Sequence, residues 1–194
     1  MGRGRDNPNR LLVEGKKDKF VIPYLLEKCG VPWPKDKNNA PVFIDEAGSW
    51  NELADVKFVS SNFKASGAKN IGIIVDADES ADGRWQRIRQ LCGTYFQQLP
   101  NSLPEEGLIV SGNSEQRLGV WIMPDNVASG MLETFLQKLI RQGSDCTLFE
   151  HAQEVCRNVK DNLGAPFKEV HFDKASLHTW LAWNDEPGPQ MHEA

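Results

Sequence analysis

The sequence predicts an α/β protein built on a mostly parallel central sheet, with helices on both faces and extra helices at the C-terminal end. Short runs of branched apolar residues, at 11–15 and 71–75, are typical of strands buried inside a parallel sheet. Amphipathic patterns with helical spacing follow both runs. The order strand–helix, repeated three times, favours parallel strands joined by helical crossovers.

The N-terminal elements follow from local signals. Residues 1–10 hold three arginines, two glycines and a proline, which predicts a flexible basic arm that either touches phosphates or is simply a solvated tail. The first strand covers residues 11–15. The next helix is expected to begin at about residues 18–20, because Pro23 is tolerated only near a first turn.

In the middle of the chain, residues 41–45 predict the second strand. Ser49 and Glu52 have the spacing of a capping box, so a helix should follow and bury Trp50, Leu53, Ala54 and Phe58. The central strand at 71–75 comes next. A helix from Asp82 to about Leu99 then carries a strongly amphipathic stripe.

The C-terminal part begins with two short strands, at 108–110 and 118–123, which form a hairpin or an edge extension of the sheet. Helices are expected from about Ser129 and over residues 145–163, the latter ending at Gly164. Residues 167–172 suggest a last strand, followed by a helix capped by Asp173. Residues 11–183 therefore form a single domain, and residues 184–194 form a polar tail.

Composition narrows the functional classes. The formal charge of −5 argues against a nucleic-acid binder that works by bulk electrostatics, but a nuclease remains compatible because a metal-binding acid cluster is itself negative. The four cysteines are scattered without a zinc spacing, and three lie on apolar helix stripes, which predicts buried reduced thiols. No signal peptide or membrane-length apolar run is seen, so we expect a cytoplasmic protein without a membrane partner.

Carboxylates stand where the predicted strands end. Asp76 and Asp78 follow the central strand two positions apart, so both can lie on one side of the extended chain, roughly 6–7 Å apart. Glu14 ends the first strand, and Asp18 lies just beyond it. Open α/β sheets place their sites at this carboxyl edge. Asp76 and Asp78 therefore either bind a metal ion or only cap the next helix.

Basic and aromatic side chains add further candidates. Lys16 and Lys17 border a predicted helix N-terminus, a position that attracts phosphate. Three tryptophans either stack on nucleic-acid bases or pack in the core, with packing favoured by their helical spacing: Trp121, Trp180 and Trp183.

These residues resemble the TOPRIM (topoisomerase–primase) family, which joins a glutamate after its first strand to an Asp-x-Asp after its third. Glu14 and the Asp76-Ala77-Asp78 segment match this pattern. Within the family the chain is most similar to OLD-type (overcoming lysogenization defect) nucleases and to small stand-alone TOPRIM-like proteins. The resemblance spans residues 11–183 and includes weaker matches at Asp18, Asp125, Glu133 and Lys174.

The resemblance implies a TOPRIM-like Rossmannoid fold and a phosphodiester-cleaving enzyme that uses Mg²⁺ or Mn²⁺. Such hard ions take carboxylate oxygens, and two ions can share the activation of water and the neutralisation of the leaving oxygen. One ion would be bound by Glu14, Asp18 and Asp76, and a second by Asp78 and Glu133 together with Asp125. Alternatively, Glu14 acts as a general acid or base.

Each weaker match has a structural alternative. Lys174 either stabilises charge in the transition state or forms a surface salt bridge. Glu133 lies on a solvated helix face if it is not a ligand, and Asp125 is otherwise a turn residue before Asn126.

Two functions follow. The first is a nuclease that acts on DNA or RNA, and the second is a non-catalytic TOPRIM-fold module that binds a protein or nucleic acid. The sequence holds no Gly-x-x-x-x-Gly-Lys-Ser/Thr loop, unlike OLD-type proteins with their ATPase domain. We therefore expect any ATP-driven control to come from a separate ABC-type ATPase, as in two-component phage-defence systems. An oligomer is compatible with either function.

Overall fold

The computed structural model describes residues 7–34, 39–112, 115–142 and 146–183. Its centre is a five-stranded sheet with the order β2-β1-β3-β5-β4. Four strands are parallel, and β4 runs antiparallel to β5 at one edge. The bounds are β1 Asn9–Val13, β2 Phe43–Glu46, β3 Asn70–Asp76, β4 Leu108–Ser111 and β5 Arg117–Met123. The predicted α/β class, with a mostly parallel sheet and a terminal hairpin, is confirmed as a Rossmann-like fold.

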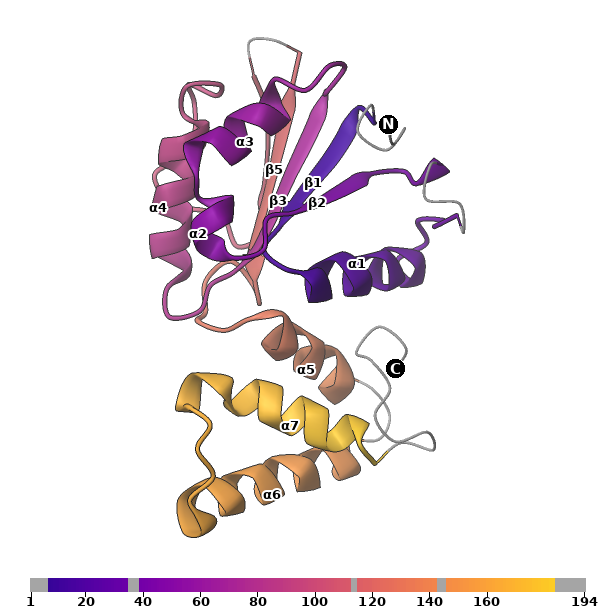
Figure 1. Ribbon diagram of the computed structural model, residues 1–194, viewed down its shortest axis with the longest axis vertical. Helices are drawn as coiled ribbons and strands as arrows, with labels where there is room; N and C mark the ends of the chain where they lie inside the picture. The colour runs from indigo at the N-terminus through magenta and orange to yellow at the C-terminus, as the bar shows by residue number, and fades with distance from the viewer. Residues whose placement is uncertain (1–6, 35–38, 113–114, 143–145, 184–194) are drawn as a thin grey trace.

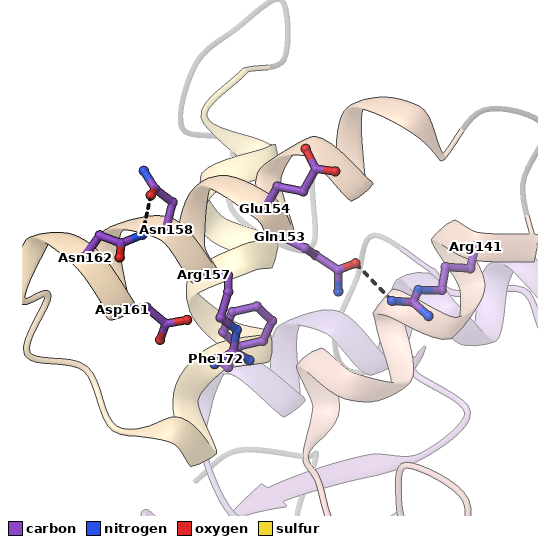
Figure 2. A pocket seen from close by; sticks show the side chains of 8 residues that line it. All are labelled: Arg141, Gln153, Glu154, Arg157, Asn158, Asp161, Asn162 and Phe172. Atoms are coloured by element: carbon purple, nitrogen blue, oxygen red, sulfur yellow. Dashed lines mark hydrogen bonds between the residues drawn. The ribbon is translucent and has the colours of Figure 1, made fainter.

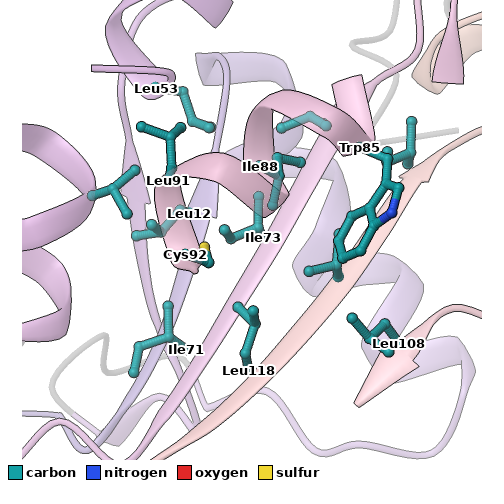
Figure 3. Packing of buried hydrophobic residues seen from close by; sticks show 14 of the residues in the cluster. Leu12, Leu53, Ile71, Ile73, Trp85, Ile88, Leu91, Cys92, Leu108 and Leu118 are labelled. Atoms are coloured by element: carbon teal, nitrogen blue, oxygen red, sulfur yellow. The ribbon is translucent and has the colours of Figure 1, made fainter. Parts of the chain in front are cut away.

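Helices cover both faces of this sheet (Figure 1). One face carries α2 (Trp50–Leu53), α3 (Val56–Phe63) and α4 (Ala81–Cys92), and the other carries α1 (Lys16–Lys28). Figure 3 shows the first layer, where Trp85 and Ile88 of α4 pack against Ile73 and Leu118 of the sheet. Burial of these large apolar side chains fixes the helices on the sheet.

The opposite face is less well covered. Ile71, Ile73 and Val75 of β3 are buried, whereas the alternate positions Gly72 and Ile74 are only partly buried. The prediction that this strand is buried on both faces is therefore wrong for the α1 face, because a single helix covers only part of it.

A separate group of helices lies beyond the carboxyl ends of the strands (Figure 1). It consists of α5 (Leu132–Gln142), α6 (Thr147–Leu163), the short 3₁₀ helix η3 (Glu169–His171) and α7 (Phe172–Leu181). Its own small core contains Phe149, Leu177 and Leu181. This arrangement confirms the extra C-terminal helices and closes the edge of the sheet at which Glu14 and Asp76 emerge. No helix in the described ranges is both long and apolar enough to cross a membrane.

The predicted strand at 167–172 is wrong. Phe167 and Lys168 lie in a loop, Glu169–His171 form η3, and Phe172 is the first residue of α7. Its ring packs under the Arg157 guanidinium at 4.1 Å, while the Phe167 ring lies 4.8 Å from the Lys160 ammonium. The aromatic residues thus cover α6 instead of a sheet. Asp173 correspondingly lies in the first turn of α7 and does not cap it.

The N-terminal boundaries also differ from the predictions. Residues 1–6 of the predicted flexible arm lie outside the described residues, as does the predicted tail at 184–194, but Asn9 and Arg10 belong to β1. Arg10 is buried, and its Nε donates to Asn62 Oδ1 at 2.7 Å. Helix α1 starts at Lys16, earlier than expected, because the Asp18 carboxylate accepts the Gly15 N–H and closes the first turn. Pro23 therefore lies inside the helix.

Two predicted helices are shorter in the structure. The segment after Ser49 divides into α2 and α3, because Asp55 accepts the N–H groups of Lys57 and Phe58 and starts a new helix. Helix α4 ends at Cys92, before the predicted Leu99.

The described cysteines are all free. Cys92 and Cys156 are buried as expected, whereas Cys146 is half-buried and Cys29 is exposed. The prediction of three buried thiols is therefore wrong for one of them.

Candidate functional site

Two neighbouring strands bring the first pair of acids together. β1 and β3 are adjacent and parallel, with Val13 opposite Ile74, so both strands end at the same edge. The Asp76 N–H donates to Glu14 Oε1 at 3.0 Å. Glu14 and Asp76, 62 positions apart in the chain, are thus in direct contact, as the sequence predicts.

Two helices complete this arrangement. Asp18, in the first turn of α1, accepts the Gly15 N–H through Oδ2 at 2.9 Å. Asp76 Oδ1 accepts the N–H of Leu132, the first residue of α5, at 2.8 Å. The carboxylates of Glu14, Asp18 and Asp76 therefore gather where β1, β3, α1 and α5 meet, and we call these three side chains the acid cluster.

Burial and mutual repulsion raise the pKa of each carboxyl group in the acid cluster. Burial raises the pKa of Glu14 to about 7, and the charges of Asp78 and Asp18 add to the effect. Burial also raises the pKa of Asp76 to about 8, with further contributions from Asp18, Glu14 and Glu133. The pKa of Asp18 is raised by burial and by Glu133. Strongly shifted carboxyl groups held close together are typical of functional sites.

These pKa values predict a pH-dependent stability. The folded-state pKa of Asp76, about 8, lies above the ordinary value of 3.8, so the folded protein binds the proton more tightly. Its contribution to stability is complete below about pH 4 and is lost as the pH rises to about 8. In metal-free buffer, Asp76→Asn should raise the melting temperature at pH 8 by about 3–6 °C, corresponding to about 1–2 kcal/mol. At pH 4 the two proteins should melt together, and equal melting temperatures at pH 8 would contradict the assignment.

Asp78 has a different environment. Its carboxylate forms a salt bridge with Arg84 Nη2, and the Arg84 Nε donates to the Asp76 carbonyl at 3.0 Å. The Arg84 guanidinium also stacks on the Trp50 ring, 4.0 Å from its centroid. Asp78 is not the cap of α4, a role taken by Ser80, whose hydroxyl accepts the Gly83 N–H. Asp78 thus lies next to the acid cluster but is already paired with a cation.

Glu133 is paired with two lysines from other helices. Only 3% of its side chain is exposed, and its Oε1 lies 3.3 Å from Lys174 Nζ and 3.6 Å from Lys17 Nζ. His178 Nε2 lies 3.2 Å from Lys17 Nζ. Burial and the neighbouring Lys17 charge lower the pKa of His178, which favours the neutral ring. Glu133 is therefore not on a solvated face. Lys174 is partly exposed and forms a salt bridge, as the alternative reading predicts, but its partner is buried.

The other predicted ligand does not join the cluster. Asp125 pairs with Lys138 and accepts the Val127 and Ala128 N–H groups within its own turn. Its pKa is lowered, chiefly by the hydrogen bond from Lys138. The alternative reading of Asp125 as a turn residue is the one that the structure supports.

The remaining candidates lie at the surface or in packing. Lys16, the first residue of α1, is exposed beside Lys17. Trp121 packs beside Met123 and Leu132, and Trp180 meets Phe149 edge-on with ring centroids 6.0 Å apart. Trp183, partly exposed, lies beside His151 instead of a base-binding surface.

Sequence reasoning missed Arg84 and His178. Arg84 lies on the charged side of an amphipathic helix, where a cation is ordinarily solvated, and His178 has no spacing to another ligand. The position of Arg84, six residues after Asp78 and one helical turn into α4, is the signal that could have identified it.

The donor set of the acid cluster suits a hard divalent ion such as Mg²⁺ or Mn²⁺, which prefers carboxylate oxygens. No Lys or Arg in the described ranges forms a salt bridge with any of its three members. Within those same ranges, however, no three Asp, Glu, His or Cys side chains are arranged to hold an ion as they stand. One oxygen of each carboxylate is engaged by a backbone N–H instead. The residues fit the ion in charge and chemistry, and they must reorient to bind it.

Two hollows show where a substrate could approach. One of about 470 Å³ is lined by Asp78, Arg84, Ser80 and His171, and none of the three acid-cluster residues lines it. Another of about 620 Å³ lies over α6, where Arg157 stacks on Phe172 and Arg141 bonds to Gln153 (Figure 2). The first hollow lies at the end of β3, where Asp78 pairs with Arg84, whereas the second is formed by α5, α6 and α7.

Comparisons with known proteins identify only the family. Neither the curated proteins nor the solved structures contain a match to this chain. A family model described as "Protein of unknown function (DUF3226)" matches residues 8–194, a range that includes every residue of the site. The chain therefore belongs to the DUF3226 family.

Proposed function

We propose that the protein is a TOPRIM-like phosphodiesterase that hydrolyses nucleic acid, DNA or RNA, with Mg²⁺ or Mn²⁺. One observation carries the proposal: Glu14, Asp18 and Asp76 converge from separate segments, are substantially buried, and have no Lys or Arg partner among the described residues. Clustered carboxylates repel one another unless protons or a cation compensate their charge. A divalent ion is the natural compensation at this edge of the sheet.

The side chains of the acid cluster would have two roles, binding the ion and accepting a proton. A bound divalent ion would supply charge neutralisation on the phosphate and activation of water. Glu14, Asp18 and Asp76 would hold it. Alternatively, Glu14 would leave the ion to Asp18 and Asp76 and would accept the proton of the attacking water, a role that fits its pKa of about 7 in the metal-free protein.

Basic groups next to the cluster suit a phosphate. Lys174 would donate to the oxygens on which charge develops, and what supports this role is that its partner Glu133, 3.3 Å away, acts electrostatically on Asp18 and Asp76. Lys16 and Lys17 are exposed at the start of α1, where the helix dipole also favours anions. These local charges allow a chain of net charge −5 to bind a polyanion at one place only. A separate ABC-type ATPase as partner stays a prediction.

The proposal is tested by incubating the purified protein with supercoiled plasmid, single-stranded DNA and tRNA, in Mg²⁺, Mn²⁺ or EDTA. We expect cleavage of at least one substrate with metal and none with EDTA. Glu14→Gln, which keeps the shape and the acceptor oxygen, should lower the rate at least about a hundredfold. Glu154→Gln, an equal loss of charge on α6, serves as the matched control and should cleave like the wild type.

Two results would contradict the proposal. One is an absence of cleavage with every substrate and metal, which would favour the non-catalytic binding module. The other is cleavage of equal rate by the wild-type and Glu14→Gln proteins, which would indicate a contaminating nuclease.

A further inference from the structure

The carboxylates at the site divide into two groups according to their partners. The acid cluster of Glu14, Asp18 and Asp76 has no basic partner among the described residues, although these are the residues expected to bind one ion. Every residue expected to bind a second ion is paired with a basic side chain: Asp78 with Arg84, Glu133 with Lys17 and Lys174, and Asp125 with Lys138.

Arg84 is held firmly in its position. Only 14% of its side chain is exposed, and it makes three kinds of contact: a hydrogen bond to the Asp76 carbonyl at 3.0 Å, a salt bridge to Asp78, and stacking on Trp50 at 4.0 Å. A planar guanidinium makes all three at once, which a lysine ammonium cannot. Displacing Arg84 from Asp78 would therefore break contacts on both sides of the guanidinium.

Asp78 is fixed as well. Its backbone adopts a left-handed conformation with φ of 50°, and it exchanges two hydrogen bonds with Gly130, at 2.8 and 2.9 Å. These bonds tie the end of β3 to the loop before α5. The Asp78 backbone is therefore held in place, and its carboxylate is oriented by the salt bridge to Arg84.

Resting on the proposed function, we propose that the site takes one divalent cation, at Glu14, Asp18 and Asp76, and that Arg84 occupies the place of a second. Lys17 and Lys174 likewise take the place of a cation beside Glu133. The fixed guanidinium and the two ammonium groups then supply, next to the phosphate, the positive charge that a second ion supplies in two-metal sites. Arg84 acts as a positioning residue, because it neutralises and orients Asp78.

Ion stoichiometry tests this directly. Mn²⁺ is titrated into the full chain by calorimetry and by electron paramagnetic resonance, with and without adenosine 5′-monophosphate as a phosphate probe. We expect one ion per chain, a spectrum of isolated Mn²⁺, and no binding by Asp76→Asn. Asp78→Asn should keep one ion with a dissociation constant within about threefold of the wild type, since Asp78 is not a ligand of that ion and its charge is already paired with Arg84. Two ions in the wild type, or loss of binding in Asp78→Asn, would overturn the proposal.

The role of Arg84 has its own readout. Arg84→Gln keeps an amide donor but leaves Asp78 without a cation, so a second Mn²⁺ should bind at Asp78 and give a spin-coupled spectrum, more weakly than the first ion because Glu133 stays paired with Lys17 and Lys174. A single ion in Arg84→Gln would refute the claim that Arg84 keeps the second ion out. Thermal unfolding of Arg84→Gln shows whether the fold is intact. Arg84→Met is a second variant that also removes the charge, for use if Arg84→Gln does not fold.

The outcome is separable from that of the proposed function. A protein that binds one Mn²⁺ and cleaves no substrate would leave the single-ion site standing and remove the nuclease. A protein that cleaves nucleic acid and binds two ions would support the nuclease and refute the single-ion site.

Discussion

Asp76→Asn should lower the rate of metal-dependent phosphodiester cleavage by about a thousandfold or more, which corresponds to about 4 kcal/mol of transition-state stabilisation. Asp76 is the member of the acid cluster that the other carboxylates surround: its pKa is raised by burial and by the charges of Asp18, Glu14 and Glu133. A neutral amide cannot supply the negative charge that the ion requires.

The substitution is well suited to a clean measurement. Asn keeps an oxygen that accepts the Leu132 N–H, so the contact between β3 and α5 is preserved. Single-turnover rates in Mg²⁺ and Mn²⁺ give the effect, and circular dichroism with thermal unfolding shows that the fold is intact. Asp161→Asn, on the exposed side of α6, is the matched control. If Asp76→Asn retains more than about a tenth of the wild-type rate, Asp76 does not bind the catalytic ion.

Lys174→Met should lower kcat by about a hundredfold to a thousandfold, the usual range for loss of one charged donor to a transition state. The Lys174 ammonium lies 3.3 Å from Glu133, and its charge partly offsets the rise that burial causes in the pKa of Asp18, which places it at the site without making it a ligand. Methionine keeps the length of the stem and removes the charge. Glu133 retains Lys17 as a partner at 3.6 Å, which limits the structural cost.

The expected pattern distinguishes a role in chemistry from a role in folding. For Lys174→Met, kcat should fall while the Mn²⁺ dissociation constant changes less than about threefold. Lys174→Arg should restore at least a tenth of the wild-type kcat, because it returns the charge. A lowered melting temperature together with an unchanged kcat would show that Lys174 only holds α7 against α5 through Glu133.

Much of the fold could be predicted because its signals are local. The apolar runs of β1 and β3, the stripe of α4 and the glycine after α6 each act within a few residues of their own position. The predictions failed where side chains from distant segments determine the backbone. Residues 167–172 contain two phenylalanines and a valine, which favour a strand, but Phe167 and Phe172 pack under Lys160 and Arg157 of α6. Arg10 looks like part of a solvated arm, but in β1 it is buried, donates to Asn62, pairs with Asp45 and lies over the Phe43 ring.

The sequence by itself determined that acids stand at the ends of β1 and β3, because strand length and the order of elements place them there. Only the tertiary structure decided which of those acids have a counter-charge. Arg84 reaches Asp78 from within one helix, but it is held there by Trp50 from another. The groups around Lys17 lie up to 161 positions away in the chain, at His178. Ion pairing depends on distances in space, and these are set by how α1, α5 and α7 pack together, which no local pattern encodes.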